Sequence, residues 1–173
     1  MASGDDSTGT RARLPVIRDG VPADAPGVAA LANMLARATG SSDGTAMTAA
    51  HVEADLIADA QMTLRVAELA GRVAGYTLSH RGYESAFAAR GRYMADLAVA
   101  PEARRRGIAR ALVADVARIT AAEGGQYVWW IVMPGNDEAQ AFYETLGGVS
   151  APVTTRAIFE APFRALLTDP ADD

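Results

Sequence analysis

Residues 96–113 read DLAVAPEARRRGIARALV, and this stretch decides both the fold class and the first functional hypothesis. An apolar run ends at Pro101, three consecutive arginines follow, and Gly107 then opens a segment with apolar residues at helical spacing. This order predicts a strand, a loop and a helix that begins near Gly107. Because the first amides of a helix lack intrahelical partners and the helix dipole favours negative charge there, the loop is a candidate anion-binding site.

Strands and helices alternate on both sides of this stretch, which is typical of an α/β protein. Strands separated by a helix are usually parallel neighbours, whereas strands joined by a short glycine-containing turn, such as the one at Ala70-Gly71, form an antiparallel hairpin. We expect strands at 14–18, 63–69, 72–80, 92–99, 127–133 and near 155–160, and helices at 27–39, 48–59, 107–122 and 137–146.

Composition narrows the class of protein. The chain has 173 residues, no cysteine, two histidines far apart in sequence and a net charge of −5. These features argue against a disulfide framework, a metal site and a general nucleic-acid binder. We expect a flexible leader over 1–13, one domain over 14–167 and an acidic tail over 168–173, in a cytoplasmic protein without a membrane span.

Residues 104–109, RRRGIA, fit the pattern R/Q-x-x-G-x-G/A, which is the pyrophosphate-binding signature of the GNAT (Gcn5-related N-acetyltransferase) family. Three other segments resemble GNAT elements in the right order: VIRDGVPAD at 16–24, DLAVAPEA at 96–103 and NDEAQAFYETLGG at 136–148. The chain resembles this family over roughly residues 14–160. The resemblance implies a GNAT-like mixed α/β fold, with a mostly antiparallel central sheet, splayed and parallel fourth and fifth strands, and flanking helices.

The resemblance also implies that acetyl-CoA is the acetyl donor. The amides of residues 105–109 would hold its diphosphate, the arginines would add charge-assisted contacts, and the main chain of the fourth strand would bind the pantetheine arm. Asn136 contacts the cofactor arm or caps the helix that follows it, and the sequence does not choose between the two. The expected cofactor-binding residues are Leu97, Ala98, Val99, Arg104, Arg105, Arg106, Gly107, Ile108, Ala109 and Asn136.

Acetyl transfer to an amine needs a proton donor for the departing thiolate and a group that removes the ammonium proton. Tyr143 lies where many GNAT members carry a tyrosine proposed as the acid; the alternative is that it packs beside Phe142 as core. Many members of the family carry a glutamate that acts as the base, in an L-E-D-x-x-V pattern. The matching position in this sequence is Ala95. Strand alternation puts Asp96 on the opposite face from Tyr93 and Ala95, so Asp96 is a structural or substrate-adjacent residue unless a bulge intervenes.

The acceptor is expected to be a small cationic amine. His80, Tyr83 and Glu84, in the segment between the third and fourth strands, are with Asp96 the tentative substrate-binding residues, and either Trp129 or Trp130 would line the acceptor cleft. A water chain is an alternative route for the proton.

Within the family the sequence looks most like the diamine and polyamine branch. An aminoglycoside or protein N-acetyltransferase, a non-catalytic acyl-CoA-binding module and a nucleic-acid module are the alternatives. A homodimer is expected by analogy with the family.

Overall fold

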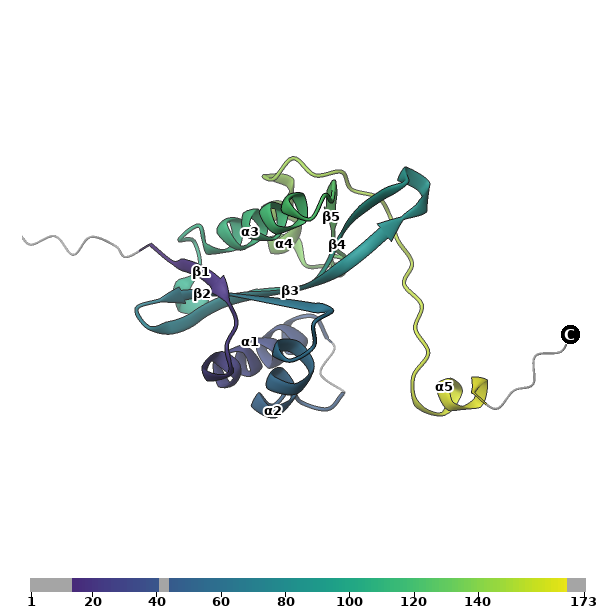
Figure 1. Ribbon diagram of the computed structural model, residues 1–173, viewed down its shortest axis with the longest axis horizontal. Coiled ribbons are helices and arrows are strands. Elements are labelled where there is room, and N and C mark those ends of the chain that lie inside the picture. The colour runs from purple at the N-terminus through teal and green to yellow at the C-terminus, as the bar shows by residue number, and fades with distance from the viewer. Residues whose placement is uncertain (1–13, 41–43, 168–173) are drawn as a thin grey trace, which may run out of the picture. The chain divides into compact units, whose positions relative to one another are not determined.

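The computed structural model describes residues 14–40 and 44–167 (Figure 1). The predicted leader at 1–13 and the acidic tail at 168–173 lie outside the described residues. The chain forms two compact units, one that ends at Asn136 and one that begins at Asp137. Each unit is described by itself below.

The first unit is built on a five-stranded sheet in which the strands follow one another in chain order. Neighbouring strands are antiparallel except for the last pair, which is parallel. The mixed sheet confirms the predicted fold class. The strands are β1 (Val16–Asp19), β2 (Met62–Leu69), β3 (Arg72–Glu84), β4 (Ala89–Val99) and β5 (Tyr127–Trp129).

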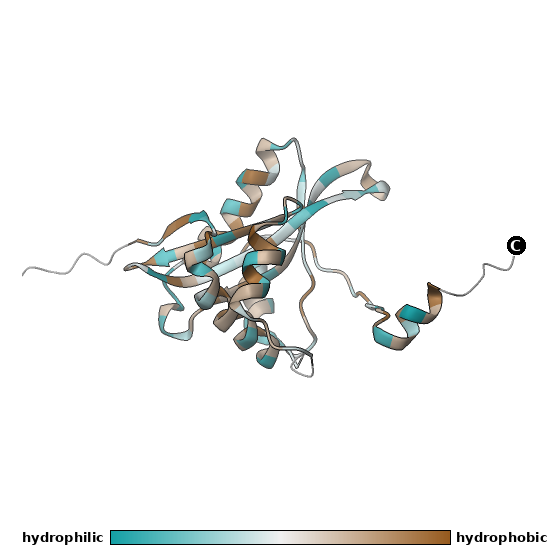
Figure 2. Ribbon diagram, turned by 60° about the horizontal axis from the view of Figure 1, so that its bottom comes forward, coloured by the Kyte–Doolittle hydropathy of each residue, from teal (hydrophilic) through white to brown (hydrophobic). Residues whose placement is uncertain are grey.

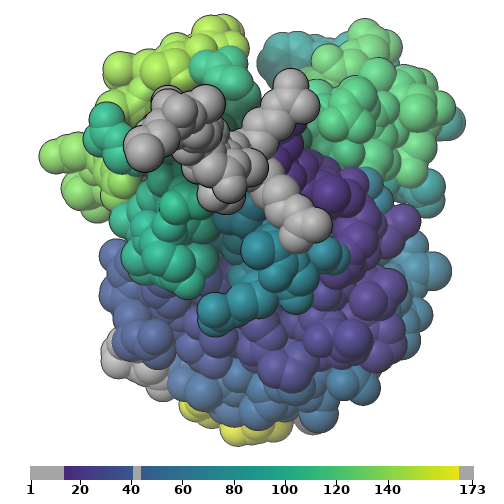
Figure 3. All heavy atoms as spheres, turned by 90° about the vertical axis from the view of Figure 1, so that its left-hand side faces the viewer, coloured from purple at the N-terminus to yellow at the C-terminus, as the bar shows by residue number. Residues whose placement is uncertain are grey.

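Helices cover both faces of this sheet. Figure 1 shows α1 (Ala25–Ala38) and α2 (Ala49–His51) on one side and α3 (Ile108–Ala122) on the other. A π-helical segment, η2 (Val52–Ile57), continues α2, and the three short 3-10 turns are η1 (Pro22–Asp24), η3 (Ser85–Phe87) and η4 (Pro101–Ala103). In the space-filling view of Figure 3 the purple to blue atoms of residues 25–57 lie together in the lower part of the face shown.

The structure confirms the predicted elements whose start or turn depends on residues close together in the sequence. Thr48 caps α2, since its hydroxyl accepts a hydrogen bond from the amide of His51 at 3.2 Å. Ala70 and Gly71 both have positive φ, at 54° and 75°, as the two-residue turn of a β-hairpin requires. Figure 2 shows both apolar and polar residues on the helices that flank the sheet, as amphipathic helices require.

The core lies mainly between the sheet and α1, α2 and η2. Val28, Val52, Val66 and Tyr76 are fully buried there. On the other face α3 buries the predicted stripe of Ile108, Leu112 and Val116, each at most 1% exposed.

Two predicted strands differ from the structure. The strand predicted at 127–133 ends at Trp129, because β5 pairs with β4 over only three residues, Gly91 to Tyr93, and its side chains are half-buried or exposed rather than buried. The final strand predicted near 155–160 is wrong. Residues 151–159 form no regular element and α5 (Glu160–Leu166) begins at the end of that segment. Apolar alternation without a pairing strand does not form a stable strand. The helix predicted at 137–146 is confirmed as α4 (Asp137–Glu144).

Candidate active site

The loop between β4 and α3 has the geometry of an anion-binding loop. Gly107 is the N-cap of α3 with φ 76°, a left-handed conformation that favours glycine, and no side-chain hydrogen bond caps the helix there. Arg105 also has positive φ, at 60°. The side chains of Arg104, Arg105 and Arg106 are exposed, while Ile108 is buried and anchors the first turn. Amides and cations are thus presented together at the positive end of a 15-residue helix.

β4 is paired on one edge and open on the other over its second half. Leu97, Ala98 and Val99 pair with β3. In the described chain the pairing of β4 with β5 stops at Tyr93, so the two parallel strands diverge beyond that point. The predicted splay is therefore confirmed, and the β5-facing edge at these three residues lacks a strand partner among the described residues.

A bulge in β4 changes which side chains lie together. Leu78 of β3 pairs with Asp96, but the next residue, Ser79, pairs with Met94. Ala95 is therefore an extra residue on β4, and the strand alternation is reset at this position. The prediction that Asp96 lies on the opposite face from Tyr93 is wrong for this reason.

Asp96 and Tyr93 share one face of the sheet. Leu78 and His80 are two residues apart and point to the same side, and their partners are Asp96 and Tyr93. The Tyr93 ring lies between those of His80 and Trp129, with ring centroids 5.4 Å and 4.8 Å away. We call His80, Tyr93, Asp96 and Trp129, which lie on one face of the sheet, the acceptor cluster, after the role that we propose for them below.

The carboxylate of Asp96 is held by a buried tyrosine. The hydroxyl of Tyr76, a residue with no exposed surface, donates a hydrogen bond to Asp96 Oδ2 at 2.8 Å. Burial raises the pKa of Asp96 above its ordinary value, and the hydrogen bond from Tyr76 lowers the pKa by a smaller amount. A carboxylate with a raised pKa is a better proton acceptor than an ordinary aspartate.

The other predicted substrate-binding residues lie elsewhere. Tyr83 pairs with Arg90 and lies on the opposite face of the sheet from Asp96. The Glu84 carboxylate accepts a hydrogen bond from the amide of Ala86 at 3.0 Å and so caps the short turn η3. The structure therefore brings His80 together with Tyr93 and Trp129 but separates both Tyr83 and Glu84 from this cluster.

Tyr143 belongs to the second unit. It is half-buried on α4 beside Phe142, with the ring centroids 5.1 Å apart, and burial raises the pKa of its phenol to about 12. Asn136 directly precedes α4, and its amide donates to the carbonyl of Met133 at 3.1 Å. The roles predicted for Tyr143 and Asn136 stay predictions.

The arginine-glycine loop thus lies between the fourth strand of a splayed sheet and the helix that follows it. Residues 28–148 match the acetyltransferase (GNAT) family. The chain belongs to this family, and it is an N-acetyltransferase. Members of the family generally use acetyl-CoA.

Solved structures share the fold at low sequence identity. An aminoglycoside acetyltransferase from an uncultured soil metagenomic sample, in complex with trehalose, is 18% identical with a TM-score of 0.68, over 85% of this chain and 96% of that one. A second aminoglycoside acetyltransferase from soil metagenomic DNA is 22% identical with a TM-score of 0.69, over 86% and 100% of the two chains. An integron cassette protein from the mobile metagenome of V. cholerae is 18% identical with a TM-score of 0.73, over 91% and 99%.

A comparison with curated proteins finds no match. In the described part of the chain no helix is long and apolar enough to cross a membrane.

Sequence reasoning missed Tyr76, and it left open whether a bulge intervenes at Ala95. Tyr76 is separated from Asp96 by 20 residues, and only the register of β3 against β4 brings the two together. The sequence did contain one signal for the bulge. Asp96 directly follows Ala95, which occupies the family's glutamate position, and a one-residue bulge would turn Asp96 to the face on which that glutamate lies.

Proposed function

We propose that this protein transfers the acetyl group of acetyl-CoA to the primary amine of a small cationic molecule, a diamine, polyamine or amino-acid-like compound, by direct attack in a ternary complex. The observation that carries the proposal is the bulge at Ala95, because it turns Asp96 onto the face of the aromatic rings. We infer that Asp96 takes the place of the family's glutamate, which the sequence pattern would put one residue earlier, at position 95.

The described residues fit acetyl-CoA. Gly107 has no side chain to obstruct a phosphate, and an added Cβ there would meet no atom within 4 Å, so the space next to the first amides of α3 is open. Exposed guanidinium groups at Arg104, Arg105 and Arg106 can make charge-assisted hydrogen bonds to phosphate oxygens. The unpaired edge of β4 at residues 97–99 can hydrogen-bond the amides of the pantetheine arm.

The acceptor cluster suits a cationic amine. An ammonium group is attracted by the faces of Tyr93 and Trp129 and by the Asp96 carboxylate. Trp129 is 45% exposed, so the ring is accessible to a ligand. Once the amine has lost its proton it is the nucleophile, and Asp96 can accept that proton directly or through water.

The chemistry needs three proton transfers. The ammonium group first loses one proton to Asp96, which passes it on to water. The neutral nitrogen then forms a bond to the acetyl carbonyl carbon, the carbon–sulfur bond breaks, the nitrogen loses its second proton to Asp96, and the thiolate of CoA takes a proton. We assign the last proton to Tyr143, in agreement with the family resemblance. The raised pKa keeps the Tyr143 phenol protonated at neutral pH, as a donor must be.

The experiment follows free CoA with a thiol reagent while purified protein is mixed with acetyl-CoA and a panel of amines. The protein has no cysteine, so it adds no thiol signal. The panel contains polyamines, diamino acids, aminoglycosides and N-terminal peptides. Tyr143→Phe should lower kcat at least about tenfold, and the control Tyr127→Phe should leave it unchanged. CoA binding without release for any amine would instead support a non-catalytic acyl-CoA module, and no binding would sink the proposal.

The same assay tests Asp96. Asp96→Asn keeps the shape and the hydrogen-bond acceptor for Tyr76 but removes the charge, and kcat/KM at neutral pH should fall by about 10²-fold or more. Tyr76→Phe keeps the buried ring and removes the donor. Because the hydrogen bond lowers the pKa of Asp96, its loss should move the acidic limb of the pH profile of kcat/KM to higher pH. An unchanged profile would remove Asp96 from the proton path.

Aminoglycosides are the second candidate acceptor class. Two structural neighbours with the same fold are aminoglycoside acetyltransferases. An aminoglycoside also carries several ammonium groups, which suit the same carboxylate and aromatic rings. The amine panel separates this class from the diamines.

We further propose that the protein is a cytoplasmic homodimer that does not bind nucleic acid. The net charge of −5 and the absence of cysteine support the cellular part of this proposal. Exposed apolar side chains in the second unit, at Ile158, Phe159, Phe163, Leu166 and Leu167, offer surface for a subunit contact. Light scattering of the purified protein tests the oligomeric state.

A further inference from the structure

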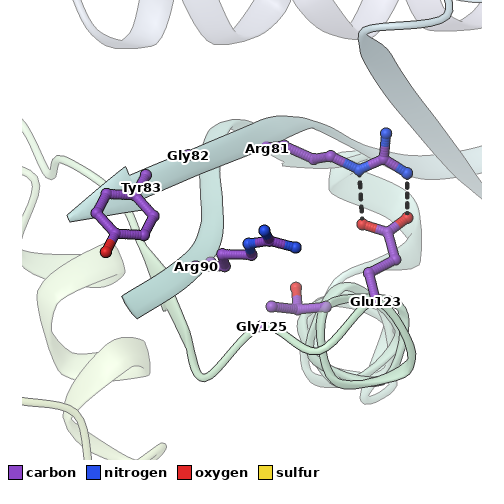
Figure 4. Close-up of a pocket in the computed structure, with 8 residues that line it drawn as sticks. Arg81, Gly82, Tyr83, Arg90, Glu123 and Gly125 are labelled. Atoms are coloured by element: carbon purple, nitrogen blue, oxygen red, sulfur yellow. Dashed lines mark hydrogen bonds and ion pairs between the residues drawn. The ribbon is translucent and has the colours of Figure 1, made fainter. Parts of the chain in front are cut away.

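A pocket of about 540 Å³ lies where the β3–β4 hairpin meets the C-terminal end of α3 (Figure 4). It is on the face of the sheet opposite the acceptor cluster, because Arg81 and Tyr83 are odd-numbered residues of β3 whereas His80 and the partner of Asp96 are even-numbered. We call it the hairpin pocket. Its lining residues are Arg81, Gly82, Tyr83, Arg90, Gly91, Thr120, Glu123 and Gly125.

The one acidic lining side chain, Glu123, is already fully engaged. Its carboxylate accepts hydrogen bonds from Arg81 Nε and Nη2, each at 2.9 Å, and from Arg92 Nη2 at 2.9 Å to each oxygen. Arg92 is only 2% exposed and also donates to Thr63 Oγ1 at 2.8 Å, so it is fixed in place. These two guanidinium groups compensate the charge of Glu123 and lower its pKa.

The negative end of α3 is also satisfied. The amides of Glu123, Gly124 and Gly125 donate to the carbonyls of Ile119, Ala121 and Thr120 at 3.1, 3.0 and 2.8 Å. Three of the last four carbonyl groups of the helix therefore have partners within the chain. Glu123 and these carbonyl groups already have partners, so they do not neutralise a further cation in the pocket.

Arg90 is that further cation. Its carbonyl accepts a hydrogen bond from the amide of Gln126 at 2.8 Å, which fixes the backbone. Its side chain is exposed and, within the described residues, makes no ion pair or side-chain hydrogen bond. Figure 4 shows the guanidinium pointing into the pocket, between Tyr83 and Glu123. Two guanidinium groups thus hold the carboxylate of Glu123 and a third, that of Arg90, lines the same pocket without an acidic partner among the described residues, in a chain whose net charge is −5.

An aromatic ring completes the pocket. Tyr83 is 64% exposed and is the cross-strand partner of Arg90. Gly82, Gly91 and Gly125 contribute main chain only, and Thr120 is the remaining lining residue. An arginine beside an aromatic face suits a ligand with an oxyanion and an apolar or aromatic body.

We propose that the hairpin pocket is a second ligand site, which binds a small molecule through a carboxylate or phosphate group held by Arg90, with the body of the ligand against Tyr83. The site is separate from the arginine-glycine loop, since the two lie at opposite ends of α3. It is separate from the acceptor cluster, since the two lie on opposite faces of the sheet. A ligand here would act as an effector rather than as a reactant.

The test is calorimetric titration of the full chain with phenyl phosphate, in the presence of saturating CoA so that the arginine-glycine loop is filled. We expect one site that Arg90→Gln weakens about tenfold or more, since charge-assisted hydrogen bonds are lost. Arg72→Gln, at an exposed arginine at the other end of β3, is the matched control and should have no effect. Tyr83→Ala should weaken phenyl phosphate more than inorganic phosphate.

Several results would overturn the site. These are no binding, equal weakening by Arg90→Gln and Arg72→Gln, or binding that only Arg106→Gln abolishes, which would place the anion on the loop. Arg90 and Tyr83 are both exposed, so their variants should keep the thermal unfolding midpoint of the wild type, and this is measured alongside.

Discussion

The two ends of α3 contain similar residues but differ in how many of their polar groups have partners within the chain. Each end has a glycine with left-handed φ, Gly107 at 76° and Gly124 at 77°, and each lies close to three arginines. At the C-terminal end two of the arginines hold Glu123 and three of the last four carbonyl groups are bonded within the chain. At the N-terminal end the arginines are exposed and the helix has no side-chain cap.

This difference separates a helix end that is bonded into the fold from the helix end that we propose binds acetyl-CoA. Ion pairs and caps at the C-terminal end contribute stability, and they hold the start of β4, where that strand still pairs with β5. A helix end without a side-chain cap contributes less stability by itself, and its first amides can bind an anion. Substitutions at the two ends should therefore change different measured quantities.

The largest expected effect is on stability, at the C-terminal end. Glu123→Ala leaves the buried Arg92 without its carboxylate, and the free energy of unfolding should fall by about 2–3 kcal/mol. The expected value is below that of a fully buried pair because Glu123 is partly exposed. Urea unfolding measures the loss. A change below about 0.5 kcal/mol would mean that the buried guanidinium finds another partner.

The next effect is on affinity, at the N-terminal end. Arg106→Gln removes a charge-assisted contact to phosphate, and acetyl-CoA should bind about tenfold more weakly. Because the side chain is exposed, the free energy of unfolding should change by less than about 0.5 kcal/mol. Titration calorimetry gives the affinity, with Arg72→Gln as the control. Equal losses in the two variants would argue for a general charge effect instead of a loop contact.

Alanine substitutions at Gly107 and Gly124 compare the two ends of α3 directly. An added Cβ meets no atom within 4 Å at either position, so alanine costs only the left-handed backbone, about 1 kcal/mol of unfolding free energy in each case. Only Gly107→Ala should also weaken acetyl-CoA, because its Cβ would stand where the phosphate approaches the amides. If Gly124→Ala weakened acetyl-CoA as much, the loss would be an indirect result of destabilising α3.

The smallest effect is a pH dependence confined to the C-terminal end. The folded-state pKa of Glu123 lies below its ordinary value of 4.5, mainly through Arg81 and then Arg92. Its contribution is therefore present above that value and is lost as pH falls through the folded-state pKa. The stability difference between wild type and Glu123→Gln should shrink from about pH 7 to about pH 3 in urea unfolding. The exposed Glu53→Gln is the control, and a pH-independent difference would contradict the pairing.

Much of the fold could be predicted because its signals are local. The turn at Ala70-Gly71, the cap at Thr48 and the start of α3 after Gly107 depend on residues within a few positions of one another, so the sequence contains them directly. The strands predicted over 127–133 and near 155–160 failed in part or entirely. Whether an apolar segment is a strand depends on a neighbour to pair with, and that neighbour is distant in sequence.

By itself the sequence determined the family, the arginine-glycine loop and the order of the main elements as far as α4, since these follow from residue types at short spacing. Only the tertiary structure decided which side chains meet. The bulge at Ala95 puts Asp96 on the same face of the sheet as Tyr93 and within hydrogen-bond distance of the hydroxyl of Tyr76, and the packing of α3 brings Glu123 to Arg92. Both depend on strand register and helix placement, where a shift of one residue moves a side chain to the opposite face.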